Sequence, residues 1–171
     1  MSTIEMAVIG CGEWGPNHIR NFQSQPGVRV RVAVDLDAKR LQRIRELFPA
    51  VECSSDADKV LADPAIQAVV VATPVQTHFT LVKKALLAGK HVLCEKPLCE
   101  TVSQARELTD LAQARRRVLM VGHVFLFNPG IIKVKEILDS GAMCSLHYMH
   151  AIRTNLGPIR RDCNAAFDLA T

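Results

Sequence analysis

The sequence predicts an α/β fold in which helices cover both faces of a parallel sheet. Short apolar runs alternate with amphipathic stretches of helical period along the first 122 residues, and this alternation is typical of parallel α/β sheets. A Gly-x-Gly-x-x-Gly turn at residues 10–15 joins the first apolar run to the first helical stretch. Right-handed crossovers would then produce a doubly wound sheet with the strand order 3-2-1-4-5-6.

The strands are predicted from the apolar runs. Residues 68–72 are apolar without alternation, which is expected of a central strand covered on both faces. Residues 28–32 instead alternate Val with Arg, so that strand should lie nearer an edge. The expected strands are residues 6–9, 28–34, 51–53, 66–72, 91–94 and 118–121, with 51–53 the weakest of them.

Capping residues mark where the helices begin. Thr101 and Gln104 form a capping-box pattern ahead of apolar residues at helical spacing. Residues 55–58 open a shorter helix in the same way, and an apolar stripe within residues 79–86 indicates another. Asn128 followed by proline predicts a helix that runs to residue 141.

Composition limits the possible functions of the chain. Its 171 residues include 21 Lys+Arg and 17 Asp+Glu spread evenly, so no basic patch points to nucleic acid as a partner. Six cysteines without a Cys-x-x-Cys pair indicate free thiols in a reducing compartment and no metal site. No apolar run approaches the ~20 residues that span a bilayer, so we expect a cytoplasmic protein without membrane contact.

The glycine-rich turn predicts a dinucleotide site. Gly10, Gly12 and Gly15 permit a tight turn and let the backbone approach a pyrophosphate, whose charge the amides at a helix N-terminus would hold. Glu13 and Trp14 lie in the same turn and are candidate cofactor contacts. For Trp14, packing against the turn without touching a ligand is an equal alternative.

A carboxylate at the end of the second strand favours NAD. Asp35 follows Gly15 by 20 residues, where it can accept hydrogen bonds from the ribose hydroxyls and would repel a 2′-phosphate. Arg40 lies on the following helix, which leaves NADP as an alternative cofactor.

A second motif follows the fourth strand. Ligands of open α/β sheets lie outside the carboxyl ends of the strands, where the strand order reverses. Thr73 and Pro74 should line the cofactor cleft there, and His78 could reach the nicotinamide ribose. The alternative is that Thr77 caps a helix and His78 faces solvent.

A third motif, Glu95-Lys96-Pro97, follows the fifth strand. Oxidation of an alcohol by hydride transfer also requires the hydroxyl proton to leave, and a lysine partly desolvated in a cleft can accept that proton. Lys96 is therefore a candidate catalytic residue, with Glu95 orienting its ammonium or touching the cofactor. From the residues alone, an exposed loop lysine is an equal alternative.

These three motifs in this order resemble the Gfo/Idh/MocA oxidoreductases, whose first domain has the Rossmann fold. Residues 121–129 resemble the family's transition from the nucleotide-binding domain to the substrate domain, and residues 153–160 resemble a segment of members that act on nucleotide-linked sugars. We interpret residues 1–122 as the dinucleotide-binding domain. Residues 123–171 then form the beginning of an incomplete α+β substrate domain.

The resemblance implies an activity and a set of site residues. The activity is NAD(P)-dependent oxidation or reduction of a secondary alcohol on a sugar, cyclitol or sugar nucleotide by a homo-oligomer. Lys96 matches the family's catalytic lysine, and Asp168 matches the first residue of its Asp-x-x-x-His pattern. The matched cofactor positions are Gly10, Gly12, Gly15, Asp35, Thr73, Pro74, His78 and Glu95.

The remaining expectations concern the last part of the chain. His123 could reach the substrate or be a buried structural histidine, and Arg153 could contact a phosphate or the cofactor. Residues 145–155 predict a strand with little chain to pair with it. Because the histidine of the Asp-x-x-x-His pattern would follow Thr171, we expect this chain to bind NAD and to turn substrate over poorly. The alternatives are a non-catalytic NAD-binding module and an interaction protein that pairs through the orphan strand.

Overall fold

The computed structural model describes residues 3–150 and 152 of the 171-residue chain. It divides into two compact units, residues 1–122 and residues 123–171.

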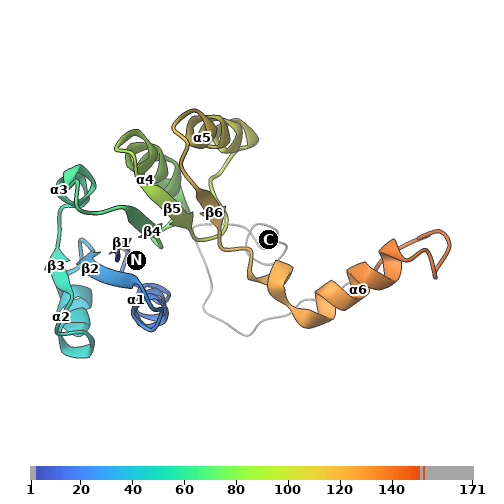
Figure 1. The fold of residues 1–171 in the computed structure, drawn as a ribbon, viewed down its shortest axis with the longest axis horizontal. Coiled ribbons are helices and arrows are strands. Elements are labelled where there is room, and N and C mark those ends of the chain that lie inside the picture. The colour runs from blue at the N-terminus through green and yellow to red at the C-terminus, as the bar shows by residue number, and fades with distance from the viewer. Residues whose placement is uncertain (1–2, 151, 153–171) are drawn as a thin grey trace. The chain divides into compact units, whose positions relative to one another are not determined.

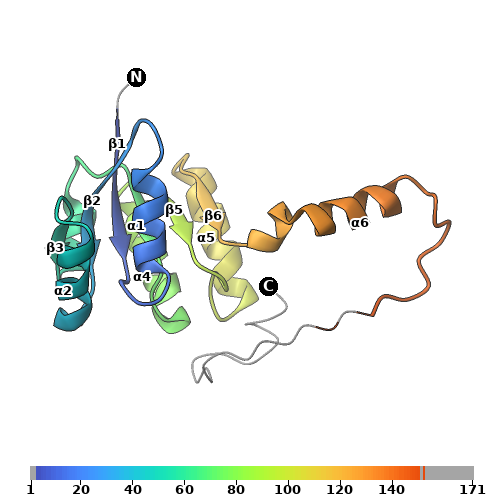
Figure 2. The same cartoon turned by 90° about the horizontal axis from the view of Figure 1, so that it is seen from below.

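The first unit is built on one parallel sheet, and the predicted strand order is confirmed. The order is β3-β2-β1-β4-β5-β6, and every neighbouring pair is parallel. Because the strands are parallel, their carboxyl ends share one edge of the sheet (Figure 2). The strands are β1 (Ile4–Ile9), β2 (Val28–Val34), β3 (Glu52–Ser54), β4 (Ala68–Val71), β5 (His91–Cys94) and β6 (Leu119–Val121).

Helices cover both faces of this sheet (Figure 1), as the doubly wound prediction requires. Helices α1 (Gly15–Gln23) and α2 (Ala38–Leu47) cover one face, and α3 (Ala57–Ala62), α4 (Val75–Leu87) and α5 (Val102–Ala114) cover the other. No helix in the described part of the chain is long and apolar enough to cross a bilayer.

Side-chain caps fix where three of these helices begin. Asp37 accepts a hydrogen bond from the Lys39 amide at the start of α2. Asp56 opens α3 in the same way, and Thr101 opens α5 by accepting from the Gln104 amide, as its capping-box pattern predicts.

The core consists of two apolar layers, one on each face of the sheet. Val71, Val82 and Leu108 are fully buried in the layer between the sheet and helices α3, α4 and α5. Val8 and Ile19 are fully buried in the layer beneath α1 and α2. Ligands of open α/β sheets bind outside the carboxyl ends of the strands, so the loops that follow the strands at this edge are the first place to look for a site.

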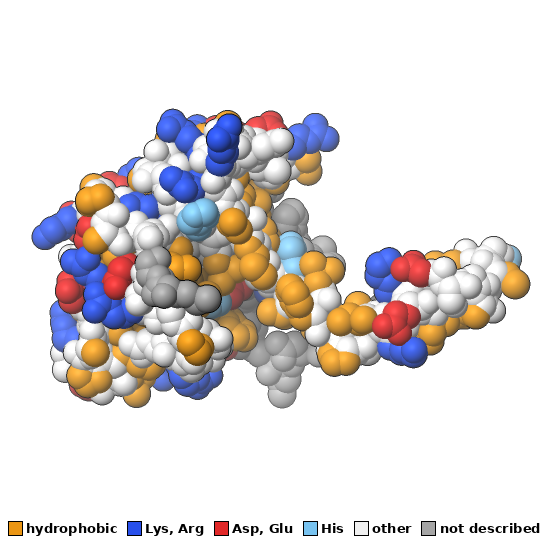
Figure 3. Space-filling model, viewed as in Figure 1, with side chains coloured by type: hydrophobic (Ala, Val, Ile, Leu, Met, Phe, Trp, Pro, Cys, Tyr) orange, Lys and Arg blue, Asp and Glu red, His pale blue; other side chains and the backbone are white. Residues whose placement is uncertain are grey.

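The second unit contains a short 3₁₀ helix η1 (Val124–Phe127) and the helix α6 (Pro129–Asp139), which begins at the predicted cap Asn128. Neither has a buried residue, and apolar side chains are exposed along α6 (Figure 3).

The strand predicted at residues 145–155 is wrong for the part of it that the structure describes. Residues 145–150 and 152 form no strand and are exposed. A strand needs a neighbour for its backbone N–H and C=O groups, and the described part of this unit offers none.

Two adjacent leucines on α4 test the packing of the core. Leu86 is fully buried between α4 and the sheet, whereas its neighbour Leu87 is 46% exposed. We expect Leu86→Ala to lower the free energy of unfolding by about 2–5 kcal/mol through lost burial and a residual cavity, and Leu87→Ala to lower it by less than about 1 kcal/mol. Urea unfolding followed by circular dichroism measures both, and equal losses would contradict the assigned face of α4.

Candidate functional site

The glycine-rich turn after β1 is shaped by close backbone contacts. Gly10 has a φ of +100°, and a Cβ there would lie 2.5 Å from the carbonyl oxygen of Ala72 at the end of β4. A Cβ on Gly15 would overlap the carbonyl oxygen of Gly10. Gly12 differs, because the nearest atom to its Cβ position is the flexible guanidinium of Arg40 at 3.9 Å. The fold therefore demands Gly10 and Gly15, whereas Gly12 leaves open surface on the turn.

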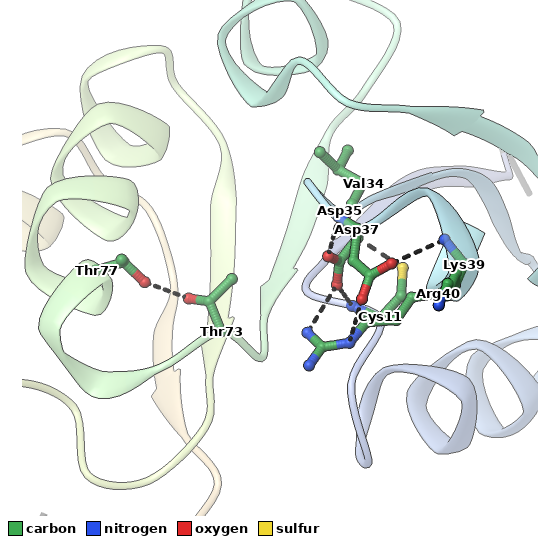
Figure 4. Close-up of polar contacts among 8 residues, drawn as sticks. All are labelled: Cys11, Val34, Asp35, Asp37, Lys39, Arg40, Thr73 and Thr77. Atoms are coloured by element: carbon green, nitrogen blue, oxygen red, sulfur yellow. Dashed lines mark hydrogen bonds and ion pairs between the residues drawn. The ribbon is translucent and has the colours of Figure 1, made fainter. Parts of the chain in front are cut away.

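Asp35 is held in one orientation beside this turn. It is 9% exposed, its Oδ2 accepts a hydrogen bond of 2.7 Å from the Cys11 amide, and its Oδ1 accepts one of 2.8 Å from the Asp37 amide. Arg40 Nη1 lies 3.5 Å from Oδ2 (Figure 4). The carboxylate predicted at the end of the second strand is thus fixed by backbone donors on two sides, with an exposed cation next to it.

The Cys11 thiol does not share in this chemistry. Burial, followed by the negative charge of Asp35, raises its pKa to about 12. The thiol therefore stays protonated at neutral pH, and Cys11 acts here as a small residue that fits a tight turn.

A pocket of about 640 Å³ opens between these loops at the carboxyl edge of the sheet. Its volume is in the range of small-molecule and cofactor sites. Gly10, Asp35 and Arg40 line one side of it, and Thr73 and Pro74 line the other. Figure 4 shows the two sides, with the Thr77 hydroxyl 2.7 Å from that of Thr73. The glycine-rich turn, the end of β2 and the loop after β4 thus meet at one cavity, whereas its lining does not include the Glu95-Lys96-Pro97 motif.

His78 is placed differently from both expectations. It is 1% exposed, so its ring neither reaches toward a cofactor nor faces solvent. Its Nδ1 lies 2.8 Å from the carbonyl oxygen of Pro97, and its Nε2 lies 2.7 Å from that of Thr73. Because both partners are acceptors, a neutral ring can satisfy one of them at a time and only the imidazolium form satisfies both. The histidine predicted as a cofactor contact instead ties the loop after β4 to the turn after β5.

Glu95 and Lys96 follow β5 at the same edge of the sheet, and both are partly buried. Glu95 Oε1 accepts a hydrogen bond of 2.7 Å from Nε2 of His18, and its Oε2 lies 3.3 Å from the Lys96 backbone N–H that donates to it. Burial raises the pKa of the Glu95 carboxyl, but the hydrogen bond and charge of His18, together with Lys96, outweigh that effect and lower it below the ordinary value. Glu95 is therefore an anion fixed by His18.

His18 is the site residue that the sequence analysis missed. It lies three residues after Gly15, one turn into α1, and this spacing puts it on the helix face next to the glycine-rich turn. This position next to the turn was the sequence signal from which His18 could have been predicted as a site residue. Its partner could not be foreseen, because Glu95 is 77 residues away in the chain.

The other predicted site residues have the following positions. Glu13 and Trp14 are exposed in the glycine-rich turn, with Trp14 54% exposed. His123 is partly buried in the second unit. Arg153 and Asp168 lie outside the described residues. In the portion that the structure covers, no three His, Cys, Asp or Glu side chains gather as metal ligands.

Comparison with known proteins identifies the family. Residues 4–123 match the model of the Gfo/Idh/MocA oxidoreductase family, described as its NAD-binding Rossmann fold. The chain belongs to this family. Its first unit is the family's NAD-binding domain, which confirms the resemblance deduced from the three motifs.

Individual relatives agree with this assignment. The chain is 32% identical over 157 residues to an inositol 2-dehydrogenase of Mycolicibacterium smegmatis, covering 91% of this chain and 46% of that protein. Among solved structures, it resembles GenD2 from gentamicin A biosynthesis in complex with NAD, with 31% identity, a TM-score of 0.78, and coverage of 83% and 40%. It also resembles KijD10, a 3-ketoreductase from Actinomadura kijaniata in complex with NADP, with 31% identity, a TM-score of 0.74, and coverage of 82% and 45%. The chain spans about half the length of the curated relatives that it matches.

The lowered pKa of Glu95 makes its contribution to stability depend on pH. A carboxyl whose pKa is lowered by folding stabilises the protein above its unfolded pKa, and this stabilisation is lost as the pH falls through the folded value. We expect Glu95→Gln to lower the free energy of unfolding at pH 7 by about 1–3 kcal/mol, and the difference from wild type to shrink below pH 4.5, the ordinary value. Urea unfolding at several pH values measures this.

The matched control for that experiment is Glu46→Gln, on an exposed surface of α2. It should change the free energy of unfolding by less than about 0.5 kcal/mol at every pH. A Glu95→Gln deficit that stays constant down to pH 3 would contradict the lowered pKa of Glu95.

Proposed function

We propose that the protein is an NAD-dependent dehydrogenase that transfers a hydride between nicotinamide and a secondary alcohol of a sugar, cyclitol or sugar nucleotide. The observation that carries the proposal is the open surface at Gly12, beside a 640 Å³ pocket with the fixed carboxylate of Asp35. The family assignment and an inositol 2-dehydrogenase among the relatives support the reaction and the substrate class.

The residues at the pocket fit a dinucleotide. The missing Cβ of Gly12 leaves room for a pyrophosphate to approach the backbone, and the N-terminus of α1 follows directly. Glu13 and Trp14 are exposed next to that position, and Thr73 and Pro74 form the facing wall. Each of these side chains is accessible from the pocket or the turn, so each is a proposed cofactor contact.

The cofactor preference follows from Asp35. Its carboxylate is a ready acceptor for the ribose hydroxyls, and its negative charge disfavours a 2′-phosphate. Arg40, 52% exposed at 3.5 Å from Asp35, supplies a cation that leaves NADP as an alternative. We therefore propose NAD as the preferred cofactor.

Lys96 is the proposed catalytic residue. A bound nicotinamide supplies the hydride acceptor or donor, and the amine of Lys96 takes the hydroxyl proton in oxidation or returns it in reduction. Its place after β5, at the carboxyl edge of the sheet, puts it in the same row of loops as the glycine-rich turn. Glu95 beside it is engaged by His18, so its proposed role is to hold this turn.

The rest of the catalytic machinery is proposed for the second unit. We propose that His123 and Arg153 contact the substrate and that Asp168 belongs to the family's catalytic pattern in that unit. A catalytic lysine transfers a proton efficiently only when the second catalytic group is oriented next to it and water is excluded from the cleft. We therefore propose that this chain by itself binds NAD and turns substrate over weakly or not at all.

Gly12 tests dinucleotide binding without disturbing the fold. Because a Cβ there would meet no atom closer than 3.9 Å, Gly12→Ala should melt at the wild-type temperature. If a pyrophosphate lies against this turn, the same substitution should weaken NADH binding by about tenfold or more. Isothermal titration calorimetry measures the affinity. Equal affinities, or no binding by the wild-type chain, would refute the site.

The Lys96→Met variant distinguishes an NAD-dependent enzyme from an NAD-binding module without catalytic activity. Lys96→Met keeps the length and most of the apolar stem of the side chain but removes the amine. We expect NADH affinity to change less than about threefold. Where the parent protein oxidises inositols or sugars with NAD⁺, the substitution should lower that rate about 100-fold or more. A variant as active as wild type would show that another group carries the proton.

A further inference from the structure

We propose that His18 is a positioning residue that holds the Glu95–Pro97 turn, and with it Lys96, from the helix that follows the glycine-rich turn. The inference deepens the proposed function, because it explains how the proposed proton-transfer residue is kept in place. It is carried by contacts that reach this turn from three directions.

The first contact comes from α1. His18 Nε2 lies 2.7 Å from Glu95 Oε1, and each of the two side chains is 16% exposed. A carboxylate only accepts hydrogen bonds, so Nε2 must carry the proton, and it does so in both the neutral and the charged ring. The ring also stacks on Phe22, with centroids 6.4 Å apart and planes at 22°, which fixes its rotation. His18 therefore presents one oriented donor to Glu95.

The second contact is at the end of β6. Glu95 Oε2, which faces the Lys96 backbone N–H, lies 3.2 Å from the Cβ position of Gly122. A side chain at residue 122 would press on the carboxylate, so glycine makes the space that Glu95 occupies. The Gly122 amide in turn donates to the Cys94 carbonyl at 2.8 Å, which closes the sheet beside the turn.

The third contact holds the turn just beyond Lys96. The His78 ring, fully buried on α4, lies 2.8 Å from the Pro97 carbonyl oxygen. Lys96 thus sits between two residues whose polar groups are each taken by a histidine from a different helix. Substitution of the buried His78 would remove the donor to a buried carbonyl and destabilise the fold itself, so the partly exposed His18 is the residue to test.

The arrangement links the two ends of the proposed cofactor site. Helix α1 begins at Gly15, where the pyrophosphate is proposed to bind, and one turn later the same helix holds Glu95 next to Lys96. Displacement of a catalytic group by about 1 Å can cost two orders of magnitude in rate. The hydrogen bond from His18 on α1 to Glu95, the residue before Lys96, limits such a displacement of Lys96.

Two substitutions at His18 test the proposal. His18→Gln keeps an N–H donor near the position of Nε2, whereas His18→Leu fills the space without a donor. We expect His18→Leu to speed hydrogen exchange of the Glu95, Lys96 and Gly122 amides about tenfold or more, and His18→Gln to restore nearly wild-type rates. Asn21→Ala, on the exposed side of α1, should leave these amides unchanged.

The lysine itself provides a second readout. After reductive ¹³C-methylation, the Lys96 signal is identified by its absence in Lys96→Met. This signal should shift in His18→Leu and return to its wild-type position in His18→Gln. A wild-type signal in His18→Leu, or faster exchange spread equally over all strands of the sheet, would overturn the proposal.

NADH titration of the wild-type chain separates this inference from the proposed function. If the chain binds no NADH, the proposed function fails while the exchange and methyl signals still report how the turn is held. If NADH binds, and neither the amide exchange rates nor the Lys96 methyl signal changes in His18→Leu, the proposed function stands and the positioning role is refuted.

Discussion

The close approach of two backbone segments is the constraint on which the site depends. Gly10 lies so near the end of β4 that a Cβ would collide with the Ala72 carbonyl, and Gly15 packs in the same way on Gly10. This contact brings the start of α1 to the centre of the sheet's carboxyl edge. Asp35, Thr73 and Lys96 each follow a strand that ends at that same edge. A bulkier turn would separate the helix N-terminus from all three.

Two acidic side chains at this edge are oriented in advance by groups of the protein. Asp35 is held by the backbone amides of Cys11 and Asp37, and Glu95 is held by the ring of His18. Because Asp35 is fixed in this way, it needs little reorganisation when a polar ligand arrives, which lowers the entropic cost of binding, whereas the fixed Glu95 holds the turn that carries Lys96. The sheet supplies their positions, and a few hydrogen bonds supply their directions.

The two units differ in how they use their apolar residues. In the first, alternating strands and amphipathic helices bury two apolar layers. In the second, η1 and α6 have no buried residue, and apolar side chains are exposed along α6 (Figure 3). Ile131, Ile132 and Val134 are among them. The Asn128 cap and the proline after it therefore predicted α6 without ensuring a core, since burial requires a partner surface as well as an apolar stripe.

Local patterns in the sequence were sufficient for the strand order, the glycine-rich turn, the caps at Asp56 and Thr101, and the place of Asp35, because each depends on residues close together in the chain or on the handedness of crossovers. The missed features depend on residues far apart. The His18–Glu95 pair spans 77 positions, and the buried ring of His78 contacts the Pro97 carbonyl, 19 positions away. The predicted strand at residues 145–155 failed over its described part, since alternation supplies a face but not a neighbour. Tertiary structure decided these points, because hydrogen-bond partners across the sheet are set by how the chain folds back on itself.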